Sequence, residues 1–367
     1  MVRERTEEEC VFHIDHDDVD DLALGSYVVG TGGGGDASLA KIMLHEAIDE
    51  YGPVQVVDAA DLDPDGLLLP IAVIGAGVAF AEKLLNGNEA ERALALLERH
   101  LDRRGVGIFP MEVGGVNTLF PLVVAARLGL PCVDADSMRR AFPRLEMTVL
   151  TLAGIPASPC VLVDTKGNTV LTETVDNVAA ENFVRSAVVA MGMFGVMSAY
   201  SLTAKQCRAH AIQNSLSYAL ELGRHVSAIQ RGDADAYDRL LAFANARILF
   251  TGKVADIERR VSEGWTKGTV TFEHLDDPDR IMRVDIQNEN LIAFEDGEAV
   301  ITTPDLITFL DMETGVPMTT ESLAYGQRLH VIGMPAHELW QTPAGIELAG
   351  PRKFGYDIDY VSFGGNA

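Results

Sequence analysis

The stretch YVVGTGGGGDASLAKIMLHEAIDEYGPVQVVD, residues 27–58, decides the fold of the first part of the chain. A short apolar run, YVVG, is followed by a glycine-rich segment, an amphipathic segment and a second apolar run, VQVVD. Short apolar runs that alternate with amphipathic segments predict strands alternating with helices. This alternation is typical of βαβ units, so we expect an α/β domain with a mainly parallel sheet.

The alternation continues to about residue 165 and then changes. Residues 1–165 are expected to form the α/β N-terminal domain, and residues 166–367 a C-terminal domain. Long helical patterns within 178–231, followed by short β-type runs with turn residues after Arg247, predict a helical part and then a β-rich portion over 245–367. Four segments carry more local predictions: a helix for VAFAEKLL (78–85), a strand for MTVLTL (147–152), a buried helix for SAVVAMGMFGVMSAY (186–200) and a strand for GIELAG (345–350).

Acidic residues outnumber basic ones, 54 to 29, which gives a formal charge of -25. This charge opposes binding to nucleic acid or to anionic membranes through a broad electrostatic surface. Residues 1–22 lack the apolar run of a secretory signal, and residues 186–200 are too short to cross a bilayer. We therefore expect a cytoplasmic protein whose partners are small molecules or proteins.

The glycine run matches the dinucleotide fingerprint G-x-G-x-x-G at Gly30, Gly32 and Gly35. Two features oppose that interpretation: Asp58, the next acidic residue at a strand end, lies 28 positions after Gly30 instead of about 20, and Asp36 places a negative charge where a pyrophosphate would rest. No nucleotide is therefore expected. A plain turn with Asp36 as helix N-cap is the structural alternative, but so many glycines favour close approach of the backbone to a ligand.

A second polar cluster interrupts the apolar pattern between residues 109 and 147. Glu112 and Asn117 flank a glycine pair, and Asp134 and Asp136 end a predicted strand. Clustered carboxylates beside an amide can hold a divalent cation or perform acid–base chemistry. The structural alternatives are Asn117 as a helix N-cap and the two aspartates as caps of the following segment.

Five blocks of sequence are similar to the S-methyl-thiohydantoin desulfurase-like family. They are GTGGGGD (30–36), EVGGVNTLFPLVVAARLGLPCVDADSMRRAFP (112–143), GIPASP (154–159), QNENLIAFEDG (287–297) and GYDIDY (355–360). Their order and spacing span essentially the whole chain. The resemblance implies a two-domain protein and, for members with an assigned reaction, removal of sulfur from a thiohydantoin ring. Members are often encoded beside, or fused to, hydantoinase/oxoprolinase proteins.

These residues and the resemblance together suggest a hydrolytic reaction at a C=S or C–SMe carbon. Such a site needs a base or a metal to activate water, an acid for the leaving group and donors for the developing negative charge. If a divalent metal is bound, Asp and Glu ligands favour Mg or Mn. The candidates are Glu112, Asp134 and Asp136 as acid and base, and Gly33, Gly34, Gly35, Asp36 and Asn117 as substrate-binding residues.

Two alternatives stay open at this point. One is a non-catalytic binding subunit that partners a hydantoinase/oxoprolinase protein. The other is a dinucleotide-binding oxidoreductase, which rests on Gly30, Gly32, Gly35 and Asp58 alone. In each case a homo-oligomer is expected.

Overall fold

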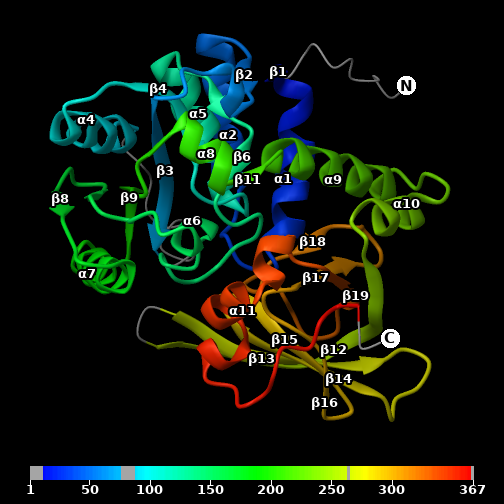
Figure 1. Ribbon diagram of the computed structural model, residues 1–367. Coiled ribbons are helices and arrows are strands. Elements are labelled where there is room, and N and C mark those ends of the chain that lie inside the picture. The colour runs from blue at the N-terminus through cyan, green and yellow to red at the C-terminus, as the bar shows by residue number, and fades with distance from the viewer. Residues whose placement is uncertain (1–10, 76–86, 263–264, 365–367) are drawn as a thin grey trace.

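The computed structural model describes residues 11–75, 87–262 and 265–364, which form a nine-stranded sheet, an eight-stranded sheet and a short two-stranded ladder. The nine-stranded sheet and its helices lie in the upper part of Figure 1, and the eight-stranded sheet lies below them. No helix in the described ranges is long and apolar enough to cross a membrane. The predicted helix at 78–85 lies outside the described residues.

The first sheet is parallel at its centre and antiparallel at its flanks. Its strand order is β1-β2-β5-β4-β3-β9-β7-β8, with β10 paired to β3, and the pairs β2–β5, β5–β4 and β4–β3 are parallel. The strands are β1 (Phe12–Ile14), β2 (Val54–Val57), β3 (Leu67–Gly75), β4 (Gly105–Pro110), β5 (Cys132–Val133), β7 (Cys160–Val163), β8 (Thr169–Thr172), β9 (Phe194–Ser198) and β10 (Leu202–Thr203). The predicted α/β fold with a mainly parallel sheet is confirmed, and strands from both sides of residue 165 join this sheet.

Helices cover this sheet. Helix α5 packs on β3 and β4, α4 packs on β7 and β9, and α7 packs on β7 and β8. The α-helices in the described ranges are α1 (His16–Val29), α2 (Ser38–Tyr51), α4 (Glu89–Leu101), α5 (Val116–Leu128), α6 (Val149–Leu152), α7 (Asn177–Ala190), α8 (Ala204–His210), α9 (Ser215–Gln230), α10 (Ala236–Phe243) and α11 (Pro343–Ala349). Because helices pack over its central part, β3 is almost entirely apolar, LLLPIAVIG, instead of alternating.

The second sheet is antiparallel throughout, in the order β16-β15-β14-β13-β12-β19-β17-β18. Its strands are β12 (Arg247–Ser262), β13 (Trp265–His274), β14 (Ile281–Gln287), β15 (Glu289–Glu295), β16 (Glu298–Thr302), β17 (Leu306–Asp311), β18 (Pro317–Met318) and β19 (Arg328–Met334). A separate apolar core lies within it, built from residues such as Phe250, Phe272 and Phe309. The predicted β-rich portion is confirmed.

The apolar run before the glycines is the end of a helix, so the prediction of a strand there is wrong. Helix α1 begins after Asp15, whose side chain accepts from the Asp17 N–H in a capping box, and it continues through Val29. Its buried residues, including Val19, Leu22 and Ser26, recur at helical spacing, and the helix packs against α9. The glycine run therefore connects two helices, and the strand that a dinucleotide fingerprint requires before its first glycine is replaced by α1.

Three further local predictions are wrong for identifiable reasons. Residues 186–200 end helix α7 and then form β9, because Gly192 and Met193 adopt positive φ and stop the helix. MTVLTL contains helix α6, capped by the Thr148 side chain, and the strand pair that follows is β7–β8. GIELAG belongs to helix α11, which Thr342 caps and Pro343 begins.

Candidate functional site

A cavity of about 130 Å³ lies at the carboxyl ends of β3 and β4, where α/β proteins commonly bind ligands. Residues 72–75 at the end of β3, Met111 and Glu112 after β4, and the start of α5 form one side of it. The glycine loop, residues 33–35, and the turn between β14 and β15 form another side. The volume is well above the ~10–15 Å³ that one water molecule requires, so the cavity has room for a small ring.

Glu112 is the best-placed ionisable group in this cavity. Glu112 is 8% exposed, and its carboxyl group accepts hydrogen bonds from Asn117 Nδ2 at 3.1 Å and from the Phe142 N–H at 3.4 Å. Burial is the largest cause that raises the pKa of Glu112 to about 7. Glu112 can therefore accept or donate a proton near neutral pH.

Asn117 fixes Glu112 relative to the sheet. Its Oδ1 accepts from the Val73 N–H at 2.7 Å, and its Nδ2 donates to the Val73 carbonyl at 3.1 Å as well as to Glu112. The Asn117 side-chain amide thus pairs with both the N–H and the carbonyl group of Val73, near the end of β3. Helix α5 begins after Gly115 with no side-chain cap, so the alternative of Asn117 as an N-cap is wrong.

The glycine loop borders the cavity, and two of its glycines are required by neighbouring protein atoms. A Cβ on Gly33 would lie 2.4 Å from Glu289 Oε1, and a Cβ on Gly34 would lie 2.8 Å from the backbone of Gly114. Gly34 also has φ +77°, a conformation that strains other residues. Much of the glycine content is therefore explained by close contact between segments of the chain.

The backbone N–H groups of this loop differ in their availability. The Gly33 N–H donates to the Gly30 carbonyl at 2.8 Å. Within the described ranges, the N–H groups of Gly34 and Gly35 have no backbone acceptor. Two of the three expected donors are thus without a backbone acceptor in residues 11–75, 87–262 and 265–364.

Asp36 lies at the start of α2 and is not part of the cavity wall. Its Oδ1 accepts from the Tyr27 hydroxyl at 2.8 Å, from the Ser38 N–H at 2.8 Å and from Ser38 Oγ at 2.7 Å. The N-cap of α2 is Ala37, with no side-chain cap, so the alternative of Asp36 as the helix N-cap is wrong, and these contacts hold the turn just before the helix.

Asp134 and Asp136 also lie outside the cavity wall. Asp134 Oδ1 accepts from the Leu216 and Ser217 N–H groups at the start of α9, at 2.8 and 3.0 Å. Asp136 Oδ2 accepts from three backbone N–H groups, of which Val113 is one at 2.8 Å, and its Oδ1 accepts from Ser215 Oγ at 2.7 Å. Both carboxylates thus have structural partners, and the structure brings together only Glu112, Asn117 and the three loop glycines.

Glu289, at the start of β15, lines the cavity and was missed from the sequence. Its side chain is 3% exposed, and its Oε2 has no hydrogen-bond partner among the described residues. Burial raises the pKa of Glu289 well above its usual range, and the charge of Glu112 raises it further. The only sequence signal was its place in the block QNENLIAFEDG, which reads as a polar turn between two strands.

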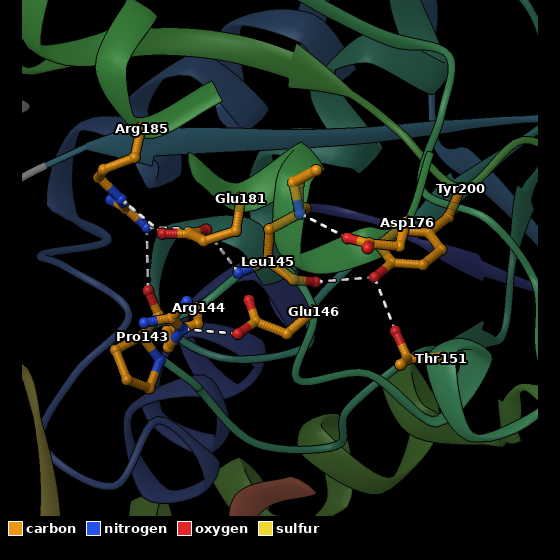
Figure 2. A network of polar contacts seen from close by, with 10 residues as sticks. Pro143, Arg144, Leu145, Glu146, Thr151, Asp176, Glu181, Arg185 and Tyr200 are labelled. Atoms are coloured by element: carbon orange, nitrogen blue, oxygen red, sulfur yellow. Dashed lines mark hydrogen bonds and ion pairs between the residues drawn. The ribbon is translucent and has the colours of Figure 1, made fainter. Parts of the chain in front are cut away.

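A network of polar contacts holds residues 143–145, which line the cavity (Figure 2). Arg185 of α7 donates to Glu181 Oε1 at 2.9 Å and to the Pro143 carbonyl at 3.0 Å. Glu181 Oε2 accepts from the Leu145 N–H at 2.8 Å, and the Tyr200 hydroxyl donates to the Leu145 carbonyl at 3.0 Å. Residues 143–145 are thus fixed from α7 and from the end of β9.

Arg144, the second arginine that lines the cavity, also forms an ion pair with a glutamate. Arg144 Nε lies 2.6 Å from Glu146 Oε1, and Glu146 is 1% exposed. Neither Arg144 nor Arg185 is therefore an uncompensated positive charge in the cavity.

The expectation of a divalent metal finds no ligand set in the structure. In residues 11–75, 87–262 and 265–364, no three His, Cys, Asp or Glu side chains are grouped to hold an ion. The structure therefore assigns no ligands to such a metal.

Comparison with known proteins identifies the family of this chain. Residues 17–174 match the family model described as S-Me-THD-like, N-terminal domain, and residues 175–363 match the S-Me-THD-like C-terminal domain. The chain belongs to the S-Me-THD-like family. Among solved structures, this S-Me-THD-like chain is similar to the crystal structure of a protein from Chromobacterium violaceum, with a TM-score of 0.79 and 24% identity over 96% of this chain and 99% of that one. That likeness shows the shared fold, and comparison with curated proteins gives no match.

Proposed function

We propose that the protein is a hydrolytic desulfurase-like enzyme that acts on a thiohydantoin or hydantoin-type heterocycle and releases sulfide or methanethiol. Membership of the S-Me-THD-like family supports the type of ring. The observation that carries the catalytic part is Glu112, a buried carboxyl group on the cavity wall whose pKa is raised to about 7. A general base with a pKa near the working pH is the group that activation of water requires.

The cavity suits a small ring that has both apolar and polar edges. Met111, Phe142, Phe194 and Met197 supply apolar wall, and the glycine loop supplies backbone. A ligand site of this type combines apolar walls with a few placed polar groups that fix orientation.

In the proposed reaction, Glu112 accepts a proton from a water molecule as the water oxygen adds to the ring carbon that bears sulfur. The tetrahedral intermediate carries negative charge that the bound ring did not carry. Donors directed at that charge stabilise the transition state more than the ground state. The N–H groups of Gly34 and Gly35 are the proposed donors.

The test is release of methanethiol from an S-methyl-thiohydantoin by the purified full-length protein. Glu112→Gln keeps the size of the side chain and one of its two accepted hydrogen bonds but removes the base, so kcat/KM should fall about 10²- to 10⁴-fold. Asp134→Asn is the matched control, because Asp134 is a buried carboxylate outside the cavity. This variant should retain most of the activity.

Two results would favour other functions. If the ring raises the melting temperature but no thiol is released, the protein is better described as a binding subunit, and a hydantoinase/oxoprolinase protein is the partner to test. If NAD or FAD stabilises the protein and the rings do not, a dinucleotide-dependent reaction becomes the better description.

A further inference from the structure

Three carboxyl groups surround one guanidinium group behind the cavity. Arg140 is fully buried, and Glu289, Asp305 and Glu112 are the groups whose charges act on it. The Arg140 guanidinium donates to the Pro304 and Asp305 carbonyls and reaches Thr31 Oγ1 at 3.4 Å, so it makes no hydrogen bond to any of the three carboxyl groups among the described residues. One buried positive charge cannot compensate three buried negative charges, so at least one carboxyl group keeps its proton near neutral pH.

Hydrogen-bond donors decide which carboxyl group this is. Asp305 accepts from the Ala336 N–H at 2.7 Å, the Phe363 N–H at 2.6 Å and the Tyr360 hydroxyl at 2.7 Å, and these donors stabilise its carboxylate form. Glu112 accepts from Asn117 and from a backbone N–H, as described above. Glu289 Oε2 has no hydrogen-bond partner in the described part of the chain, which makes Glu289 the group with least support for a negative charge.

The position of Glu289 is fixed by contact with the glycine loop. Its Oε1 would lie only 2.4 Å from a Cβ on Gly33, and the Asn290 N–H beside it donates to the Thr31 carbonyl at 2.8 Å. Glu289 thus enters the cavity from the second sheet, whereas Glu112 enters from the first. Glu112 accepts two hydrogen bonds, whereas Glu289 Oε2 accepts none among the described residues. Two carboxyl groups in such different surroundings have different pKa values, so one can act as the base and the other as the acid.

We infer that Glu289 is the acid of this site and protonates the departing sulfur while Glu112 acts as the base. This inference rests on the proposed function. It fills the role that Asp134 and Asp136 would have taken if the fold had placed them in the cavity.

The proton and electron balance of the step is as follows for an S-methyl-thiohydantoin. Water adds to the C=N carbon, one water proton passes to Glu112 and then to the ring nitrogen, and the π electrons become the nitrogen lone pair. As the intermediate collapses, the C–S electron pair leaves with sulfur, the Glu289 proton joins that sulfur, and the hydroxyl proton passes to Glu112. Return of this proton from Glu112 to Glu289 restores the site, and the products are a hydantoin and methanethiol.

The experiment compares two leaving groups on the same ring, S-methyl and S-(4-nitrophenyl), with wild type and Glu289→Gln. Methanethiolate is a strong base and needs a proton to leave, whereas 4-nitrothiophenolate is a weak base and leaves without one. For Glu289→Gln we expect kcat/KM to fall about 10²- to 10⁴-fold with the S-methyl substrate and less than about tenfold with the S-aryl substrate. Glu112→Gln is the matched control and should lose activity on both, because both reactions need activated water.

If Glu289→Gln lost equal kcat/KM on both substrates, or none on either, the assignment of Glu289 as the acid would be overturned. The proposed function would stand in that case, provided that the wild type releases the thiol. A wild type that releases thiol from neither substrate would overturn the proposed function and, with it, this role of Glu289. Circular dichroism and thermal unfolding check that Glu289→Gln folds. If it does not, Glu289→Asp, which keeps the acid but withdraws it by one methylene, should show the same contrast between leaving groups.

Discussion

At the scale of single residues, the fate of a buried carboxyl group follows from the donors around it. Asp136 receives three backbone N–H groups and a hydroxyl, and it serves the structure. Glu112 receives two donors and faces a cavity, and Glu289 Oε2 receives none among the described residues. All three side chains are carboxylic acids, but the number of hydrogen-bond donors around each one gives it a different structural or chemical role.

Replacement of Glu112 by Gln should stabilise the protein at alkaline pH. Burial raises the pKa of Glu112 from 4.5 to about 7, so the folded state holds this proton more tightly than the unfolded state. The stability that the protonated form contributes is complete below pH 4.5 and is lost as the pH rises through 7, a loss of about 3 kcal/mol for a shift of this size. Denaturant unfolding at pH 5 and pH 8 measures this effect.

Glu112→Gln should be more stable than wild type at pH 8, with a difference that shrinks toward pH 5. A difference of the same size at both pH values would contradict the raised pKa. Glu98→Gln, a change in a carboxyl group outside the cavity, serves as the control.

The sequence could identify some of these residues but not their grouping. Glu112 and Asn117 are only 5 positions apart and flank a glycine pair, so their proximity is local information. Asp134 and Asp136 have the same strand-end pattern as a ligand site, but it is also the pattern of a helix cap. Glu289 is 177 positions beyond Glu112, and only the pairing of β14 with β15 beside the glycine loop brings them together.

At the scale of elements, helix α1 is the feature that local sequence patterns misrepresent. Its last residues, YVV, are bulky and partly β-branched, which favours a strand. Tertiary packing overrides this preference, because the buried residues of α1 recur with helical spacing from Val19 to Val29. The close approach of the α1 and α9 backbones depends on two glycines, Gly25 and Gly223, which have no Cβ.

Gly223→Ala should destabilise the protein although alanine favours helix. A Cβ on Gly223 would lie 1.5 Å from the Asp21 carbonyl oxygen of α1, so the two helices would have to separate. Overpacking of this kind costs about 1–3 kcal/mol or more, against a gain of about 1 kcal/mol in helix propensity. Chemical denaturation measures the net loss.

Gln230→Ala, at an exposed position of the same helix, is the control and should change stability little. An increase in stability for Gly223→Ala would show that α1 and α9 do not pack as closely as described.

At the scale of the whole molecule, the cavity is built where the two sheets meet. The glycine loop after α1 receives the Asn290 N–H at Thr31 and the Thr320 N–H at Gly32, each at 2.8 Å. The segment after β4 of the first sheet contributes Glu112, and β15 of the second sheet contributes Glu289. The fold class follows from alternation and turn patterns in the sequence, whereas a site shared between two sheets depends on long-range packing that no local pattern contains.

The central claim is that this cavity hydrolyses a thiohydantoin-type ring with Glu112 as its base. Its most direct test is the pH dependence of kcat/KM for methanethiol release by the wild type and by Glu112→Gln. A base must be deprotonated to act, so wild-type kcat/KM should rise with pH through an inflection near the Glu112 pKa of about 7, and it should fall again at higher pH as Glu289 loses its proton. Glu112→Gln should lack that inflection. An unchanged inflection in the variant, or no methanethiol release by the wild type at any pH, would contradict the account.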